Sequence, residues 1–327
     1  MYIPDMRHKS TPCAAVLCFA WLAATAWNLP AQESPRAQHC KLINASQPQY
    51  SKLVFDYIRL DPSSDISNDV WQSIVTSIKQ RDLEAYPGWV DDLQQAGVVY
   101  RLQDQGYIHA KATVGASNIT GDPAQQHVGL TVHVEAGAQY KVLSVAFRLT
   151  DPSDALLLSE AELRSLVPVQ DGEPFSSSKL RLAFNQLRKI YSAQGYVDFV
   201  PTPDMQFDNT NHQIALVIEL DQGKQYEIGN ITVRGLSPAL ENELRSKLRP
   251  GDVMDSQLID DFYDSHQSVL PSDATPADLE MEKNVRAGIV DLVFDFRSCA
   301  QVPPDAPTSP NATTPKLVRQ LPKRVSN

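Results

Sequence analysis

Apolar and polar residues alternate in two matching stretches of the chain, residues 128–134 and residues 214–220. Side chains at every second position lie on the same face of a β-strand, so each stretch predicts a strand with one buried face. Ahead of the later stretch, apolar residues recur at helical spacing, which predicts an amphipathic helix. These residues are Leu180, Phe184, Leu187 and Tyr191.

The surroundings of the two strands repeat as well. Gln105-Gly106-Tyr107 precedes the first strand, and Gln194-Gly195-Tyr196 precedes the second. Gly137 with Tyr140 and then Gly223 with Tyr226 follow them. A unit of roughly ninety residues is therefore present at least twice, which is typical of tandem modules.

Each unit predicts the element order strand, helix, helix, strand, strand. The fold class is α+β, with tandem βααββ modules that each carry a three-stranded sheet and two helices on one face. We expect an extended array of three such modules, at residues 53–136, 137–222 and 223–298. The third prediction is the weakest, because Ser272–Thr275 stands where the others have Gly-Tyr.

Several glycines mark turns in this pattern. Gly106 and Gly195 sit where a helix must reverse into a strand, a position that favours positive φ. Gly137 and Gly223 are expected at turns between modules, and Gly235 at a further turn. The tyrosines that follow the first two glycines are expected to be core residues.

The N-terminal segment has the order of a secretory signal, predicted at residues 1–31. Arg7 and Lys9 precede an uncharged apolar run over 14–27, and cleavage is expected near Ala31. The alternative is an uncleaved membrane anchor, but this run is short of the about 20 residues that a span needs. Residues 32–52 are predicted to be a linker.

The C-terminal segment, residues 299–327, is rich in proline and is predicted to be disordered. Four basic residues lie among its apolar ones, so a tether to an anionic surface such as a lipid headgroup is one interpretation. A merely solvated tail is the alternative. If the tail is a tether, we expect it to hold the protein at the membrane surface.

Cys40 and Cys299 are the cysteines that remain if the signal is removed. An extended array would hold them far beyond the 4.4–6.8 Å between Cα atoms that a disulfide requires. An intramolecular bond therefore demands that the flanking segments fold back. Pairing between chains and free thiols are the alternatives.

Composition excludes several functions. The net charge of −10 disfavours a nucleic-acid partner, because phosphate neutralisation needs clustered Lys and Arg. The seven histidines show no partners at the spacing of a metal site, and no phosphate loop or nucleophile motif is present. We therefore predict no catalytic residues, no metal and no cofactor.

The repeated pattern resembles polypeptide-transport-associated (POTRA) domains. The resemblance rests on Gly195-Tyr196, on Gly223, on the opening strand at 226–235 and on the Leu248-Arg-Pro-Gly251 turn, and it covers residues 53–297. In that family such modules precede an outer-membrane β-barrel in the periplasm. The chain is expected to have the modules without the barrel.

The resemblance implies a non-enzymatic periplasmic protein-binding module that assists outer-membrane protein assembly or docks on a barrel-assembly machine. Its expected partners are an outer-membrane β-barrel protein or barrel-assembly complex and unfolded outer-membrane protein clients. We expect binding by β-augmentation, in which a client pairs with a free sheet edge. The alternatives are an envelope spacer or adaptor with one fixed partner, an enzyme, and an idle remnant of a barrel protein. The predicted edge comprises Tyr107, Ile108, Tyr196, Val197, Asp198, Phe199 and Val200.

Overall fold

The computed structural model describes residues 33–45, 49–121 and 125–302. The predicted signal peptide at 1–31 and the greater part of the predicted tail, beyond residue 302, lie outside these ranges. No helix among the described residues is long and apolar enough to span a membrane.

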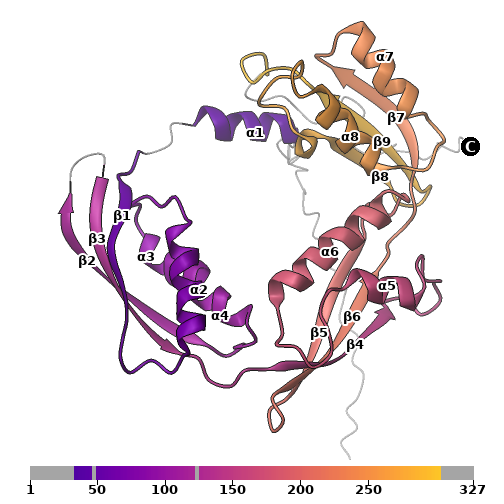
Figure 1. Ribbon diagram of the computed structural model, residues 1–327. Coiled ribbons are helices and arrows are strands. Elements are labelled where there is room, and N and C mark those ends of the chain that lie inside the picture. Colours follow the sequence, from indigo (N-terminus) through magenta and orange to yellow (C-terminus); the bar gives the residue numbers. More distant parts are fainter. Residues whose placement is uncertain (1–32, 46–48, 122–124, 303–327) are drawn as a thin grey trace, which may run out of the picture. The chain divides into compact units, whose positions relative to one another are not determined.

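The described residues contain three separate three-stranded sheets (Figure 1). In each sheet the last strand in sequence lies in the centre, parallel to the first strand and antiparallel to the second. The first sheet has β1 (Lys52–Leu60), β2 (Lys111–Gly121) and β3 (Gln125–Glu135). The second has β4 (Lys141–Leu149), β5 (Val200–Asp208) and β6 (Gln213–Asp221). The third has β7 (Glu227–Arg234), β8 (Glu280–Asn284) and β9 (Ile289–Asp295).

Helices pack against one face of each sheet (Figure 1). The first sheet has α2 (Asn68–Lys79) and a continuous stretch of α3 (Trp89–Asp92), the π-helical η1 (Leu93–Val99) and α4 (Tyr100–Gln103). The second has α5 (Glu160–Leu166) and α6 (Ser177–Ser192). The third has α7 (Pro238–Lys247), α8 (Ser256–His266) and the short 3-10 helix η2 (Pro276–Asp278). The predicted α+β modules are confirmed, and we call them the first, second and third modules.

The second module shows how the sequence pattern builds a core. Along β6, Ile214, Leu216, Ile218 and Leu220 are fully buried, and the residues between them are partly exposed. The helical face predicted from Leu180 to Tyr191 packs onto them in one cluster. Burial of a Leu or Ile side chain contributes about 1.5–3 kcal/mol, so this cluster is what holds the helix on the sheet.

The two Gly-Tyr turns join consecutive modules. The main-chain oxygen of Gly106 accepts a hydrogen bond from the N–H of Tyr140 at 2.8 Å, and that of Gly195 accepts one from Tyr226 at 3.0 Å. Both glycines have positive φ, 88° and 84°. Gly137, Gly223 and Gly235 also have positive φ, at 67°, 64° and 85°. The chain thus turns sharply on both sides of each joint.

The strands that follow the Gly-Tyr turns begin later than predicted. Residues 196–199 and 107–110 form turns, closed by hydrogen bonds from Phe199 N–H to Tyr196 O and from Ala110 N–H to Tyr107 O. The ring of Phe199 stacks on Tyr191, with 3.8 Å between ring centroids. The turn bonds use main-chain groups that a strand ladder would need, so the strand predicted to start at Tyr196 begins only at Val200.

The predicted linker contains a helix, α1 (Pro35–Asn44), which begins at the cap Ser34. Cys40 of this helix forms a disulfide with Cys299, and the two Cα atoms are 5.1 Å apart. The expectation that the modules would keep these cysteines far apart is therefore wrong. Cys299 and Val302 are buried against α1, so the start of the predicted disordered tail is ordered.

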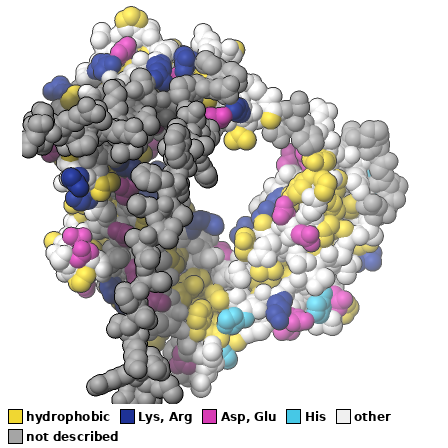
Figure 2. Space-filling model, turned by 180° about the vertical axis from the view of Figure 1, so that it is seen from behind, with side chains coloured by type: hydrophobic (Ala, Val, Ile, Leu, Met, Phe, Trp, Pro, Cys, Tyr) yellow, Lys and Arg dark blue, Asp and Glu magenta, His cyan; other side chains and the backbone are white. Residues whose placement is uncertain are grey.

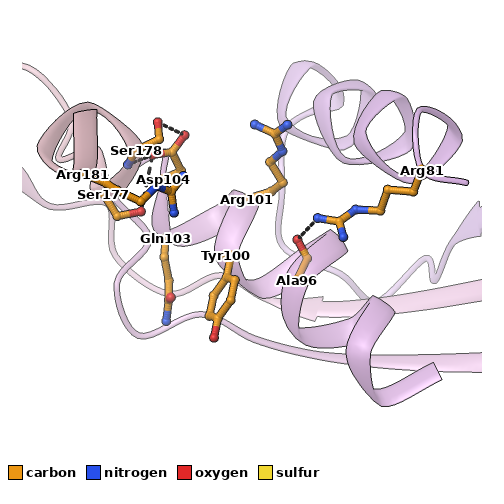
Figure 3. Close-up of a pocket in the computed structure, with 9 residues that line it drawn as sticks. All are labelled: Arg81, Ala96, Tyr100, Arg101, Gln103, Asp104, Ser177, Ser178 and Arg181. Atoms are coloured by element: carbon orange, nitrogen blue, oxygen red, sulfur yellow. Dashed lines mark hydrogen bonds between the residues drawn. The ribbon is translucent and has the colours of Figure 1, made fainter. Parts of the chain in front are cut away.

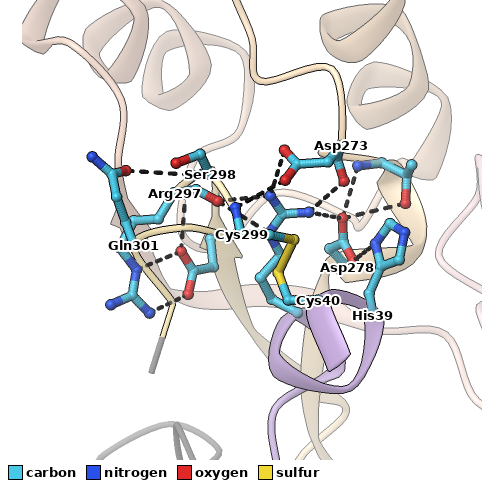
Figure 4. A network of polar contacts seen from close by, with 11 residues as sticks. His39, Cys40, Asp273, Asp278, Arg297, Ser298, Cys299 and Gln301 are labelled. Carbon is cyan, nitrogen blue, oxygen red and sulfur yellow. Dashed lines mark hydrogen bonds and ion pairs between the residues drawn. A yellow bond between two sulfur atoms is a disulfide. The ribbon is translucent and has the colours of Figure 1, made fainter. Parts of the chain in front are cut away.

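A network of polar contacts around the disulfide completes the attachment of α1 to the third module (Figure 4). Arg36 is 0% exposed and forms ion pairs with Asp273 at 2.9 Å and Asp278 at 3.1 Å. It also donates to the main-chain oxygen of Arg297 at 2.7 Å. A buried guanidinium needs such partners because its desolvation is costly.

Candidate functional site: the free edge of β5 and its groove

The hydrogen bonds of β6 show which residues of β5 direct their main-chain N–H and C=O groups away from the sheet. The main-chain oxygen of Leu220 accepts from Thr150, on the β4 side of the sheet. Leu220 is paired with Pro201 across the β5–β6 ladder, whose register has no shift. Main-chain groups alternate in direction along an antiparallel strand. Pro201, Pro203, Met205 and Phe207 therefore direct their main-chain groups away from β6.

The two prolines remove hydrogen-bond donors from half of this free edge. Proline has no N–H, and in sheets it is confined to positions that need none. Met205 and Phe207 keep their N–H groups, and neither group has an acceptor among the described residues. The free edge of β5 can therefore pair with an added strand at Met205 and Phe207.

The corresponding edge of the first module is partly covered. The oxygens of Val132 and Val134 accept from residues on the β1 side, so Val114, the partner of Val132, directs its main-chain groups outward. The N–H of Val114 donates to the side-chain oxygen of Gln94 at 3.1 Å. The side chain of Gln94 thus covers the middle of this edge.

The corresponding edge of the third module is short. β8 spans five residues, and its Lys283 forms an ion pair with Asp198. Short strands and charged side chains are common protections of a sheet edge. Of the three edges β2, β5 and β8, β5 has the longest run of main-chain groups that no side chain covers.

An open apolar groove lies between β5 and α6. Its volume is about 630 Å³. Phe175, Leu180 and Phe184 line it from the second module, with Pro203 and Met205 from β5. Ile108 of the first module also lines it, as do polar residues at its rim. Apolar side chains gather in patches between charged ones on the visible surface (Figure 2).

The other residues predicted for the client-binding edge lie at the joints. Val197 packs against the core of the third module, and Tyr107 packs against that of the first. Asp198 accepts a hydrogen bond from the hydroxyl of Tyr226 at 3.0 Å. Tyr196 packs on the second core. The structure therefore brings only Ile108 of this predicted set into the groove, and Val200 to the start of β5.

A second pocket, of about 430 Å³, adjoins the groove and shares three lining residues with it, Gln103, Ser177 and Arg181 (Figure 3). Its lining also includes Arg81 and Arg101. Arg81 donates to the main-chain oxygen of Ala96 at 2.8 Å. The sequence pattern did not single out these arginines, because they come together only in the folded chain.

Asp104 links the first two modules inside this pocket. Its carboxylate accepts from the N–H of Ser178 at 2.7 Å and from the hydroxyls of Ser178 and Ser176 at 2.9 and 2.8 Å. Burial alone raises the pKa of Asp104, but these hydrogen bonds and the nearby Arg101 outweigh it and hold the pKa below its usual value. The carboxylate thus stays charged at the N-terminus of α6.

No group of three or more His, Cys, Asp or Glu side chains within the described ranges could hold a metal ion.

Known proteins resemble this chain in sequence. Residues 154–223 match the POTRA family model, described as a surface antigen variable number repeat. The outer membrane protein assembly factor BamA of Buchnera aphidicola subsp. Acyrthosiphon pisum (strain APS) is 22% identical over 138 residues. The match covers 42% of this chain and only 22% of that protein.

Solved structures resemble it in fold. BamA POTRA3-5 of Haemophilus influenzae superimposes with a TM-score of 0.54 at 17% identity, covering 76% of this chain and 97% of that one. The likeness to POTRA1-3 of the periplasmic domain of Omp85 from Anabaena covers 76% of this chain and 98% of that one, at 16% identity and a TM-score of 0.31. The predicted resemblance to tandem POTRA domains is confirmed.

Proposed function

We propose that this chain, whose three tandem modules resemble POTRA domains, is a non-enzymatic protein that binds extended polypeptides during outer-membrane protein assembly. The observation that carries this proposal is the free edge of β5 beside an apolar groove. The N–H groups of Met205 and Phe207 pair with the client main chain, and the groove receives alternate client side chains.

Such binding makes little demand on client sequence, because main-chain hydrogen bonds are common to all polypeptides. Unfolded outer-membrane proteins are suitable clients, since their strands alternate in polarity. The proposed location is the periplasm, peripheral to the outer membrane. The proposed partner is a barrel-assembly complex. The similarity to the outer membrane protein assembly factor BamA supports this choice.

The alternative function is a structural spacer or adaptor with one fixed partner. The attachment of α1 to the third module favours it, because a disulfide and a buried ion-pair network restrict how far the termini of the described segment can separate. A spacer binds no client peptides. A client-binding protein binds several of them weakly.

The test is binding of fluorescein-labelled 12-residue peptides from outer-membrane strands to the purified, oxidised protein, followed by fluorescence anisotropy. Met205→Pro removes one outward N–H and Met205→Ala keeps it, while both remove the same groove side chain. Proline fits the ladder at this position, because Pro201 and Pro203 already occupy equivalent ones. We expect Met205→Pro to weaken binding about tenfold relative to Met205→Ala, because a main-chain hydrogen bond to the client is lost.

Circular dichroism of both variants checks that the fold is kept. Equal binding by the two variants shows that the N–H of Met205 makes no bond to the client and removes β5 from the proposal. Absence of binding by the wild-type protein contradicts client binding altogether and favours the spacer.

A further inference from the structure

The exposed side of α6 carries a polar stripe along the groove. Ser177, Arg181, Asn185 and Arg188 are spaced three or four residues apart and all line the groove. Residues at this spacing lie on one face of a helix. The groove therefore has an apolar floor and a rim of one charge sign.

No acidic residue lines the groove. Arg188 donates to Asn185 at 3.2 Å and has no ion-pair partner within the described ranges. Arg181 has neither a hydrogen bond nor an ion pair to any described residue. In a chain of net charge −10, two arginines without acidic partners beside one groove are a local reversal of charge.

The reversal continues into the adjoining pocket. Arg81, Arg101 and Arg181 line it, and its one lining carboxylate, Asp104, already accepts hydrogen bonds from the start of α6. That carboxylate offsets one of the three positive charges, so the lining of the pocket keeps a net positive charge. The arginines offer planar donors that suit carboxylates.

We propose that this site selects polypeptide segments in which an acidic side chain adjoins alternating apolar residues. The proposal rests on the proposed client binding and specifies its client class. The apolar side chains enter the groove beside Phe184 and Met205, and the carboxylate meets Arg181 or Arg188 at the rim. A polypeptide is the favoured occupant over an anionic lipid, because only a polypeptide pairs with the N–H groups of Met205 and Phe207.

The experiment compares three peptides that share one alternating apolar sequence and end in Asp-Asp, Asn-Asn or Lys-Lys, all amidated at the C-terminus. Binding to the full protein is measured by anisotropy at about 50 and 300 mM salt. We expect the acidic peptide to bind about five- to tenfold more tightly than the neutral one at low salt, because partly exposed ion pairs contribute modestly. The preference should shrink at high salt.

Two double variants test the location. Arg181→Gln/Arg188→Gln removes the rim charges, and the matched control Arg249→Gln/Arg286→Gln removes two exposed arginines of the third module. We expect the first to abolish the preference for the acidic peptide without changing binding of the neutral one. The control should keep the preference.

Each other outcome is decisive. Equal binding of acidic and neutral peptides overturns the selectivity and leaves the proposed client binding intact. Failure of all three peptides contradicts the proposed function itself. Equal effects of the two double variants overturn the assignment to this groove. Binding of phosphatidylglycerol vesicles that requires Arg181 and Arg188, without any peptide preference, identifies a lipid site and overturns the proposal.

Discussion

The guanidinium of Arg36 donates to the main-chain oxygen of Asp273. The equivalent oxygens of the other two modules, on Gln105 and Gln194, each accept from the side-chain amide of a glutamine that leads into the next module. Both of those bonds are 2.9 Å long, from Gln139 and Gln225. Arg36 thus takes, on the third module, the place that an incoming module takes on the first two.

The same comparison explains the position of the disulfide. Gln139 and Gln225 follow the central strand of their own module at the position that Cys299 holds after β9. The N–H of Cys299 donates to the carboxylate of Asp273 at 2.8 Å. Burial tends to raise the pKa of Asp273, but this bond and Arg36 lower it overall. Helix α1 therefore closes the last joint of the array.

Replacement of Arg36 should destabilise the third module strongly. Arg36→Ala leaves the buried carboxylate of Asp278 without its guanidinium partner, and such a loss costs about 3–5 kcal/mol. The free energy of urea unfolding, followed by circular dichroism, measures the effect. Lys41→Ala on the same helix removes an exposed ion pair and should cost less than about 1 kcal/mol. Similar costs for the two variants would show that the buried network contributes little.

Loss of the disulfide should lower stability as well. The bond joins residues 259 positions apart, and the loop-entropy model gives about 5–6 kcal/mol for so long a loop. We expect Cys40→Ser/Cys299→Ser to unfold at lower urea than the oxidised wild type. Dithiothreitol should bring the wild type to the level of the variant and leave the variant unchanged. An effect of dithiothreitol on the variant contradicts this explanation.

Gly106 and Gly195, at the turns that join consecutive modules, should tolerate substitution by alanine less well than other glycines of positive φ. A Cβ at Gly195 lies 2.9 Å from the oxygen of Tyr226, whereas a Cβ at Gly172 meets nothing within 4 Å. Both have similar φ, 84° and 83°. Gly172→Ala should cost about 1 kcal/mol from the backbone alone, and Gly195→Ala clearly more. Urea unfolding of the two variants provides the comparison, and equal costs exclude a role for the close approach.

The hydroxyl of Tyr191 is a polar group buried without a hydrogen-bond partner in the described structure. Burial raises the pKa of Tyr191 to about 12, so the hydroxyl remains protonated at all ordinary pH values. Tyr191→Phe removes the unpaired group while keeping the ring on Phe199, and should stabilise the second module by about 1 kcal/mol. Thermal unfolding measures the change. A loss of stability would reveal a partner for the hydroxyl.

The joint between the first two modules should weaken in acid. The pKa of Asp104 is lower in the folded protein than the ordinary value of 3.8, so its contribution is fully present above that pH and is lost as pH falls through the folded value. Asp104→Asn should therefore be less stable than the wild type at pH 7, and the difference should close below about pH 3.8. Asp91→Asn, at an exposed carboxylate, serves as the control. A difference that is constant from pH 7 to pH 3 contradicts the role of this charge.

Local periodicity predicted the modules well because each one is a nearly self-contained core. The alternating apolar residues of β6 and the helically spaced residues from Leu180 to Tyr191 form the two faces that pack together in this core. The sequence also contains a local signal for helix α1, because Ser34-Pro35 is a typical start of a helix. The prolines at 201 and 203 likewise indicated an edge strand that begins after the Gly-Tyr turn.

By itself the sequence determined the repeated α+β modules, because the period of apolar residues specifies which faces are buried within about ninety residues. Only the tertiary structure decided the candidate site, because it depends on contacts between residues distant in sequence. The side chain of Gln94 covers one edge, Asp104 bridges two modules, and Arg36 reaches Asp273 across most of the chain. Such pairings follow from packing in three dimensions, and no local pattern encodes them.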